Sequence, residues 1–227
     1  MAVAEAISPN VQDYAKAVYA LEARRAGAVS TNALAGRMGI TSGSVSGMLR
    51  KLSELGLVEH QPYRGVRLTE RGRRVALEVL RHHRLIELYL AEELGMPWDR
   101  VHAEAEVLEH VLSEDLEQLI SARLGDPVVD PHGDPIPSAA FEVDEGRSRS
   151  LHELETGARG RFVRVSDSDP EMLRYLAEKG VELGARVELT GRHPFGGPVV
   201  ARVGERELPL GEQLARAMQV ELEETGA

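Results

Sequence analysis

The sequence predicts a mostly α protein with a small β domain at its C-terminal end. Three observations support this fold class. Apolar residues recur at helical spacing over much of the first 124 residues. A helix, a glycine-containing turn and a second helix are followed by a short hairpin pattern before residue 70. Short alternating segments separated by glycine-rich turns fill the region after residue 150. The 227 residues therefore divide into expected domains at 1–75, 76–140 and 151–227, with a linker at 141–150.

The first domain is expected to be a winged helix-turn-helix. Ser8-Pro9 is a helix start, with a capping hydroxyl before a proline at the first helical position. A second helix is expected at Thr31–Met38, and a third begins at Thr41 or Ser42 after the Gly39-Ile40 turn. Strands at residues 57–60 and 66–68 then form the hairpin, or wing.

Two long helices are expected next, from Thr69 to Leu94 and from Asp99 to Leu124. Apolar positions at helical spacing predict a bundle-type domain that packs on itself or on a second subunit. On the second helix, four potential metal ligands at i, i+4, i+7 and i+8 would share one stripe: His102, Glu106, Glu109 and His110.

His83 and Glu87 repeat the i, i+4 pairing one helix earlier. A solvated charged face would also explain such stripes. Three of the chain's eight His lie on them, which favours a metal site. Because the chain has no Cys, imidazole nitrogen and carboxylate oxygen would have to hold the ion.

The last domain is expected to be a small β barrel. Alternating strands are expected at residues 161–165, 186–189 and 199–203, with a helix from Asp169-Pro170 to Gly180 and a last amphipathic helix after Gly211. His132, in the proline-rich segment before the linker, is expected at the surface.

The net charge of -10 hides two regions of opposite sign. Residues 1–75 hold 11 Lys and Arg against 6 Asp and Glu and so carry +5, whereas the remainder holds 16 against 31 and carries -15. A basic head suits a phosphate-rich partner, and an acidic body suits cations. The start of the chain lacks a basic signal-peptide region, and no apolar run is long enough to span a membrane, so a cytoplasmic protein is expected.

The third helix is the expected DNA-reading element, because a helix N-terminus with small hydroxyl residues suits phosphates and bases. Modest base readout and a strong salt dependence are expected. A winged helix that contacts protein instead is the other interpretation. The candidate DNA contacts are Thr41, Ser42, Ser44, Ser46, Gly47, Arg50, Lys51 and, at the wing tip, Arg64.

The order of these motifs resembles the diphtheria-toxin-repressor family of metal-dependent transcriptional repressors, over nearly the whole chain. The matching segments are 13–14 with 19–22, the helix-turn-helix, 68–72, 82–87, 101–106, 109–114 and 131–137. The resemblance implies a homodimer that binds a double-stranded, inverted-repeat operator near metal-homeostasis genes. It also implies a helical dimerisation and metal domain and a C-terminal SH3-like (FeoA-type) domain.

The resemblance further implies a primary activating site made of Asp13, Glu106, Glu109 and His110. Iron-responsive relatives carry Met and Cys where this chain has Asp13 and Glu106, whereas manganese-responsive relatives carry carboxylates. Hard oxygen ligands suit Mn²⁺, although carboxylates also bind Fe²⁺, and Co²⁺ or Zn²⁺ can occupy such sites in vitro.

An ancillary site is implied at His83, Glu87 and His102, with the third domain lending ligands from the start of its helix. The nearest positions there are Asp169 and Met172, with Glu171 adjacent, and Met172 departs from the polar residue of the family. A paired-metal arrangement would place a Glu one turn after Asp13. Lys16 stands there instead, which favours two separated sites.

The expected mechanism joins the first helix to the metal domain through the ion, which fixes the spacing of the two recognition helices. Since ligand His must be neutral, activation should weaken below about pH 6. Two alternatives are weaker. A regulator that senses an organic ligand would need more than the 4% aromatic content found here. A di-metal carboxylate enzyme would need Glu-x-x-His on two helices, but Val107 and Leu80 stand in the Glu positions, so no enzyme is expected.

Overall fold

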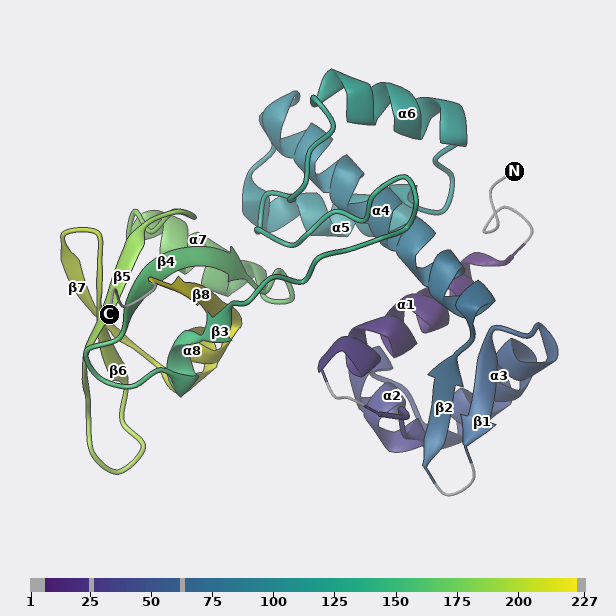
Figure 1. Ribbon diagram of the computed structural model, residues 1–227, viewed down its shortest axis with the longest axis horizontal. Helices are drawn as coiled ribbons and strands as arrows, with labels where there is room; N and C mark the ends of the chain where they lie inside the picture. Colours follow the sequence, from purple (N-terminus) through teal and green to yellow (C-terminus); the bar gives the residue numbers. More distant parts are fainter. Residues whose placement is uncertain (1–6, 25–26, 62–63, 224–227) are drawn as a thin grey trace. The chain divides into compact units, whose positions relative to one another are not determined.

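The computed structural model describes residues 7–24, 27–61 and 64–223, which form two compact units. The first unit comprises residues 1–85, 106–126 and 137–143, and the second comprises 86–105, 127–136 and 144–227. Figure 1 shows the helices and strands of each unit. Helices α4 (Glu70–Glu92) and α5 (Trp98–Leu108) contribute residues to both.

The winged helix begins the first unit. It consists of α1 (Pro9–Arg24), α2 (Thr31–Met38), α3 (Ser42–Glu54), β1 (Val58–Gln61) and β2 (Gly65–Leu68). These bounds agree closely with those expected from the sequence. The expected turn at Pro62-Tyr63 lies outside the described residues.

Side-chain caps explain where the short helices start. Ser30 accepts a hydrogen bond from the Ala33 amide at the start of α2, and Thr41 accepts one from the Ser44 amide at the start of α3. The Glu22 carboxylate of α1 accepts a hydrogen bond from the Leu68 amide at 3.0 Å, which fixes the wing against α1. A buried apolar core, including Val18, Leu34, Leu52 and Val66, holds the three helices and the hairpin together.

The prediction of a single helix from Asp99 to Leu124 is wrong. The segment is two helices, α5 and α6 (Glu114–Arg123), separated by a turn at residues 109–113. Ser113 caps α6 by accepting a hydrogen bond from the Leu116 amide, and acidic residues fill the first turn of α6. These features favour a new helix start. Glu109 and His110 therefore lie in a turn and not on a helical stripe.

The second unit contains a six-stranded antiparallel sheet in the order β3-β8-β4-β5-β6-β7. Its strands are β3 (Arg149–Ser150), β4 (Arg159–Val165), β5 (Arg186–Arg192), β6 (Val199–Val203), β7 (Arg206–Leu210) and β8 (Met218–Leu222). A 3-10 turn (Leu151–Glu153), α7 (Pro170–Glu178) and α8 (Glu212–Ala217) complete the domain. Phe162, Leu173, Leu189 and Met218 are among its fully buried core residues.

The sequence pattern located β4, β5, β6 and α7 but missed β3, β7 and β8. The amphipathic helix expected after Gly211 is short, because α8 ends at Ala217 and β8 follows directly. In β8, Met218 and Val220 are buried while Gln219 is half-buried and Glu221 exposed, which is the two-residue period of a strand. Within the described residues, no helix combines the length and apolarity needed to cross a bilayer.

Candidate metal centre and nucleic-acid interface

A group of potential ligands forms in the first unit, where α1 meets the turn that follows α5. Asp13 comes from the second turn of α1, and Glu109 and His110 come from the turn. Their ligand atoms lie within 4.8 Å of one another. His110 Nε2 is 2.9 Å from Asp13 Oδ1 and 3.5 Å from Glu109 Oε1. The structure thus brings together three of the four residues expected at the primary site.

Neighbouring groups orient His110 toward this group. Its Nδ1 lies 2.6 Å from the Gln12 side-chain oxygen, and the Gln12 amide nitrogen donates a hydrogen bond to the Ile7 carbonyl at 3.0 Å. With the amide held this way, the Gln12 oxygen accepts a hydrogen bond from Nδ1, and Nε2 is the ring nitrogen that faces Asp13. This is the second-sphere arrangement that a metal-binding His needs.

Asp13 fits a cation ligand on independent grounds. Its Oδ1 atom is buried and has no hydrogen-bond partner among the described residues. Burial raises the pKa of Asp13, while His110 and Lys16 act in the opposite direction. A buried carboxylate oxygen beside an imidazole nitrogen offers the oxygen and nitrogen ligands that a divalent cation takes in a site without Cys.

Glu106, the fourth expected residue, lies on the last turn of α5 at the edge of the group. Its side chain is 43% exposed, whereas that of Glu109 is fully buried. The Lys16 ammonium lies 2.7 Å from Glu106 Oε1 and 2.6 Å from Glu109 Oε1. Glu109 also pairs with His83 Nδ1 through its other oxygen. The clustered carboxylates therefore have a cation of their own chain among them.

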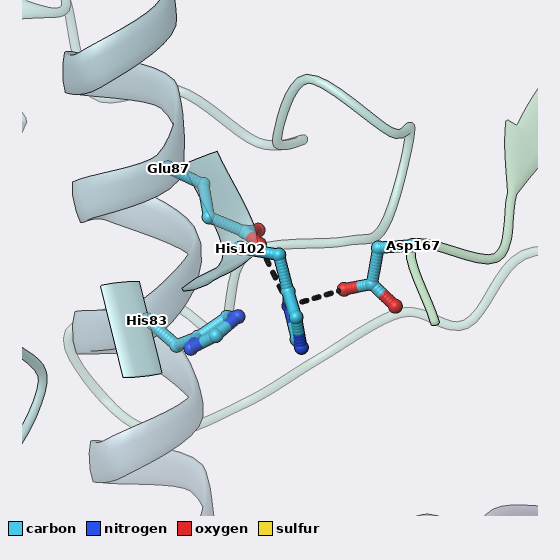
Figure 2. A group of neighbouring side chains, drawn as sticks. All are labelled: His83, Glu87, His102 and Asp167. Atoms are coloured by element: carbon cyan, nitrogen blue, oxygen red, sulfur yellow. Dashed lines mark hydrogen bonds and ion pairs between the residues drawn. The ribbon is translucent and has the colours of Figure 1, made fainter. Parts of the chain in front are cut away.

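A second group gathers the expected ancillary residues (Figure 2). Glu87 comes from α4, His102 from α5 and Asp167 from the segment between β4 and α7, all in the second unit. His102 Nδ1 lies 3.0 Å from Asp167 Oδ2 and 3.2 Å from Glu87 Oε1. His83, one turn before Glu87 on the same helix, completes the group of four potential ligands.

The contacts of His102 shift its titration. Hydrogen bonds to Asp167 and Glu87 raise the pKa of His102 to about 10. Burial acts to raise the pKa of Asp167, but the hydrogen bond from His102 and the positive charges of His102 and His132 together outweigh it and leave that pKa lowered. A cation that binds here displaces a proton from His102 at pH values well above 6. The expected weakening of activation below about pH 6 stays a prediction.

Asp167, and not the expected Asp169 or Glu171, is the acidic residue beside His102. Asp169 caps α7: its Oδ1 accepts hydrogen bonds from the amides of Glu171 at 3.0 Å and Met172 at 3.4 Å. Asp before a proline at the first helical position is a strong N-cap, which explains why the side chain is turned to its own backbone. Neither Asp169 nor Glu171 is among the residues grouped with His102.

His132 is fully buried, so the expectation of a surface position was wrong. Its Nε2 donates a hydrogen bond to the Trp98 carbonyl at 2.8 Å, and its Nδ1 lies 3.7 Å from Glu87 Oε2. Burial acts to lower the pKa of His132, but Glu87, Asp130 and the Trp98 carbonyl together outweigh it and raise that pKa to about 9. His132 thus holds Glu87 in place through its second oxygen, Oε2. The proline-rich sequence around His132 did not indicate this role.

The expected DNA-facing residues lie on the exposed side of α3 and on the wing. Ser42, Ser44, Ser46, Gly47, Arg50, Lys51 and Arg64 are all exposed, as is the capping residue Thr41. The four hydroxyls are engaged within the protein: Ser42 donates to the Asn32 side chain, Ser46 donates to the Ser42 carbonyl, and the hydroxyls of Thr41 and Ser44 share a hydrogen bond. Arg50 and Lys51 are the basic groups that α3 presents to solvent.

Comparisons with known proteins identify this arrangement of domains. Three family models match in order: the iron dependent repressor N-terminal DNA binding domain at residues 6–66, the iron dependent repressor metal binding and dimerisation domain at 69–138, and the FeoA domain at 149–222. The iron-dependent repressor IdeR of Mycobacterium bovis is 32% identical over 200 residues, which are 83% of this chain and 86% of IdeR.

The chain belongs to the diphtheria-toxin-repressor family. It is a metal-dependent transcriptional repressor and not an enzyme. The resemblance inferred from the sequence is confirmed, as is the fold class of winged helix, helical metal domain and SH3-like C-terminal domain.

Solved structures of family members also match. A manganese-dependent transcriptional repressor in complex with manganese is 42% identical with a TM-score of 0.88, covering 94% of this chain and all of the other. ScaR with bound Zn²⁺ is 28% identical with a TM-score of 0.80, covering 93% of this chain and 98% of the other.

Proposed function

We propose that this repressor is activated by Mn²⁺, with Fe²⁺ as the alternative metal, and then binds an inverted-repeat DNA operator as a homodimer. The observation that carries the proposal is the group formed by Asp13, Glu109 and His110, in which a buried carboxylate oxygen faces an imidazole nitrogen across 2.9 Å. The regulated genes would be those of metal homeostasis, as in the family that the chain resembles.

The donor set supports Mn²⁺ over softer ions. Asp13, Glu106 and Glu109 offer carboxylate oxygens, and the chain has no Cys to offer a thiolate. The similarity to a manganese-dependent repressor, at 42% identity, points the same way. Affinity within the first transition series still rises past Mn²⁺, so Co²⁺ and Zn²⁺ should also bind in vitro.

The placement of the ligands suggests how metal binding becomes DNA affinity. Asp13 belongs to α1, which packs on the helix-turn-helix, whereas Glu109 and His110 belong to the turn between α5 and α6. A bound divalent ion supplies positive charge that joins these two elements. Asp13 then holds α1 in one position, and α1 orients α3. By linkage, DNA that prefers this position also strengthens metal binding.

The family segments support a division into the domains expected from the sequence: 1–75 for DNA binding, 76–140 for metal binding and dimerisation, and 151–227 for the SH3-like domain, joined by 141–150. Exposed apolar residues offer a surface for dimerisation, namely Val107, Val111, Leu116 and Leu119. The ancillary ligands proposed are His83, Glu87 and His102, with Asp167 in place of Asp169 or Glu171.

Genomic DNA fragments selected by the protein in Mn²⁺ provide the test. Fluorescence anisotropy on a selected fragment should show tight binding in Mn²⁺, and binding at least about tenfold weaker in EDTA. His110→Ala should lose the response to Mn²⁺, while the control His193→Ala, at an exposed position, should keep it. Equal DNA affinity in Mn²⁺ and EDTA would refute metal activation.

A further inference from the structure

Two groups of potential ligands adjoin at the primary site and share one carboxylate. Asp13, Glu109 and His110 form the first, and His83, Glu106 and Glu109 form the second; within each, the ligand atoms lie within 4.8 Å of one another. Glu109 belongs to both and directs one oxygen toward each side. Such sharing is the geometry of paired-metal sites, in which a carboxylate bridges two ions about 3.5–4 Å apart.

A cation of the chain itself already contacts the second group. Lys16 lies one turn after Asp13 on α1, and its Nζ is 2.7 Å from Glu106 Oε1 and 2.6 Å from Glu109 Oε1. The Lys16 side chain is only 15% exposed. Burial disfavours its charge, but the attraction of Glu109 and Glu106 outweighs burial and raises the pKa of Lys16. With two carboxylate oxygens within 2.7 Å, Nζ forms short charge-assisted hydrogen bonds.

We propose that Lys16 serves as a tethered second cation, whose ammonium occupies the position defined by Glu106 and Glu109 and so restricts the activating site to one divalent ion. The inference rests on the proposed function, since it concerns the same site. Asp13, Glu109 and His110 remain for that ion.

Charge and hydrogen bonding both exclude a second ion. In the second group, Glu106 Oε1 already accepts a hydrogen bond from Lys16 and Glu109 Oε2 pairs with His83, so both oxygens are engaged where a second ion would bind. Two positive charges a few ångströms apart in a partly buried site repel strongly. The same repulsion weakens binding of the first ion, so Lys16 sets the sensor to respond at a higher metal concentration than a site without the ammonium.

Lys16→Glu in the full chain is the direct test, with Mn²⁺ alone as the probe. The bound Mn²⁺ per chain is measured by equilibrium dialysis and elemental analysis, and electron paramagnetic resonance separates isolated Mn²⁺ from an exchange-coupled pair. The wild type should show isolated Mn²⁺ only. The variant should gain one Mn²⁺ per chain and the coupled signal.

Lys16→Met gives a second test that does not depend on creating a ligand. Removal of the charge should strengthen Mn²⁺ binding by at least about tenfold. In EDTA, where no metal takes part, it should lower the midpoint of thermal unfolding by a few degrees, because Glu109 loses its buried counter-ion.

The outcomes separate this inference from the function on which it rests. A coupled pair in the wild type, or a folded Lys16→Glu that binds no further Mn²⁺, overturns the role of Lys16 and leaves metal activation standing. Unchanged Mn²⁺ affinity in Lys16→Met overturns it as well. A wild-type protein that binds no Mn²⁺ would refute both the activation by Mn²⁺ and the inference.

Discussion

Glu109 and Glu106 contact the same ammonium but should differ sharply in what they contribute to stability. Glu109 is fully buried and pairs with Lys16 and His83, whereas Glu106 is 43% exposed. Removing one partner of a buried ion pair costs about 3–5 kcal/mol, while an exposed pair contributes about 0–1 kcal/mol. Since Lys16 keeps Glu106 when Glu109 is lost, the cost of Glu109→Gln should lie near the lower end, at about 3 kcal/mol.

Urea unfolding in EDTA measures this difference without any metal contribution. Glu109→Gln should lower the free energy of unfolding by about 3 kcal/mol, and Glu106→Gln should lower it by less than about 1 kcal/mol. Repeating the titration with Mn²⁺ at 100 times its dissociation constant should stabilise the wild type by about 2.7 kcal/mol and Glu109→Gln by almost nothing. Equal costs for the two variants in EDTA would show that burial does not distinguish these carboxylates.

Three further predictions address DNA binding, the ancillary group and pH. Arg50→Ala should weaken DNA binding and reduce the slope of log affinity against log salt concentration by about 1, whereas the exposed control Arg147→Ala should change neither; an unchanged slope would remove Arg50 from the phosphate contacts. Asp167→Asn should weaken Mn²⁺ binding at the His102 group, measured by isothermal titration, because Asp167 lies beside His102. Asp169→Asn should leave that binding unchanged, because Asn also caps helices well. Weaker Mn²⁺ binding in Asp169→Asn but not in Asp167→Asn would restore Asp169 as a ligand. The pKa values of His102 (about 10) and His132 (about 9) are raised in the folded protein, so both groups contribute stability that is complete below the unfolded pKa of 6.5 and is lost as pH rises toward 10. In EDTA, the free energy of unfolding measured with urea should therefore decline from pH 6.5 to 10. A flat profile would contradict the charged state of both histidines.

Local patterns were enough to predict the winged helix. Its capping residues Ser30 and Thr41 and the helical spacing of buried residues such as Val45 and Leu49 act within a few residues of one another. The ends of helices were harder to predict where a helical spacing of side chains continues past a residue that can start a new helix. The stripe from His102 to His110 seemed continuous, yet Ser113 starts a new helix and leaves His110 in the turn.

The sequence identified the residue types of the metal groups but not all of their partners. Asp13 and His110 are 97 positions apart, and only the family resemblance suggested that they meet. Asp167 was missed because Asp169, two residues later, matched the expected start of a helix better. The burial of His132 depends on the packing of Trp98 and Glu87, which no local pattern encodes.

The contacts of Lys16 were also beyond the sequence. Its position one turn after Asp13 argued only that a carboxylate was missing from a paired-metal arrangement. The structure adds that the ammonium lies on two carboxylates from distant parts of the chain, at 2.7 and 2.6 Å. Lys16, which seemed only to depart from a metal-binding pattern, thus balances the negative charge of Glu106 and Glu109.

Anomalous diffraction at the manganese edge, from crystals of the full chain grown with Mn²⁺, tests most directly whether a divalent ion links α1 to the turn after α5. A peak bounded by Asp13, Glu109 and His110, with Lys16 still on Glu106, is the predicted result. Full occupancy of other sites with no peak here, and with Asp13 turned to solvent, would contradict it.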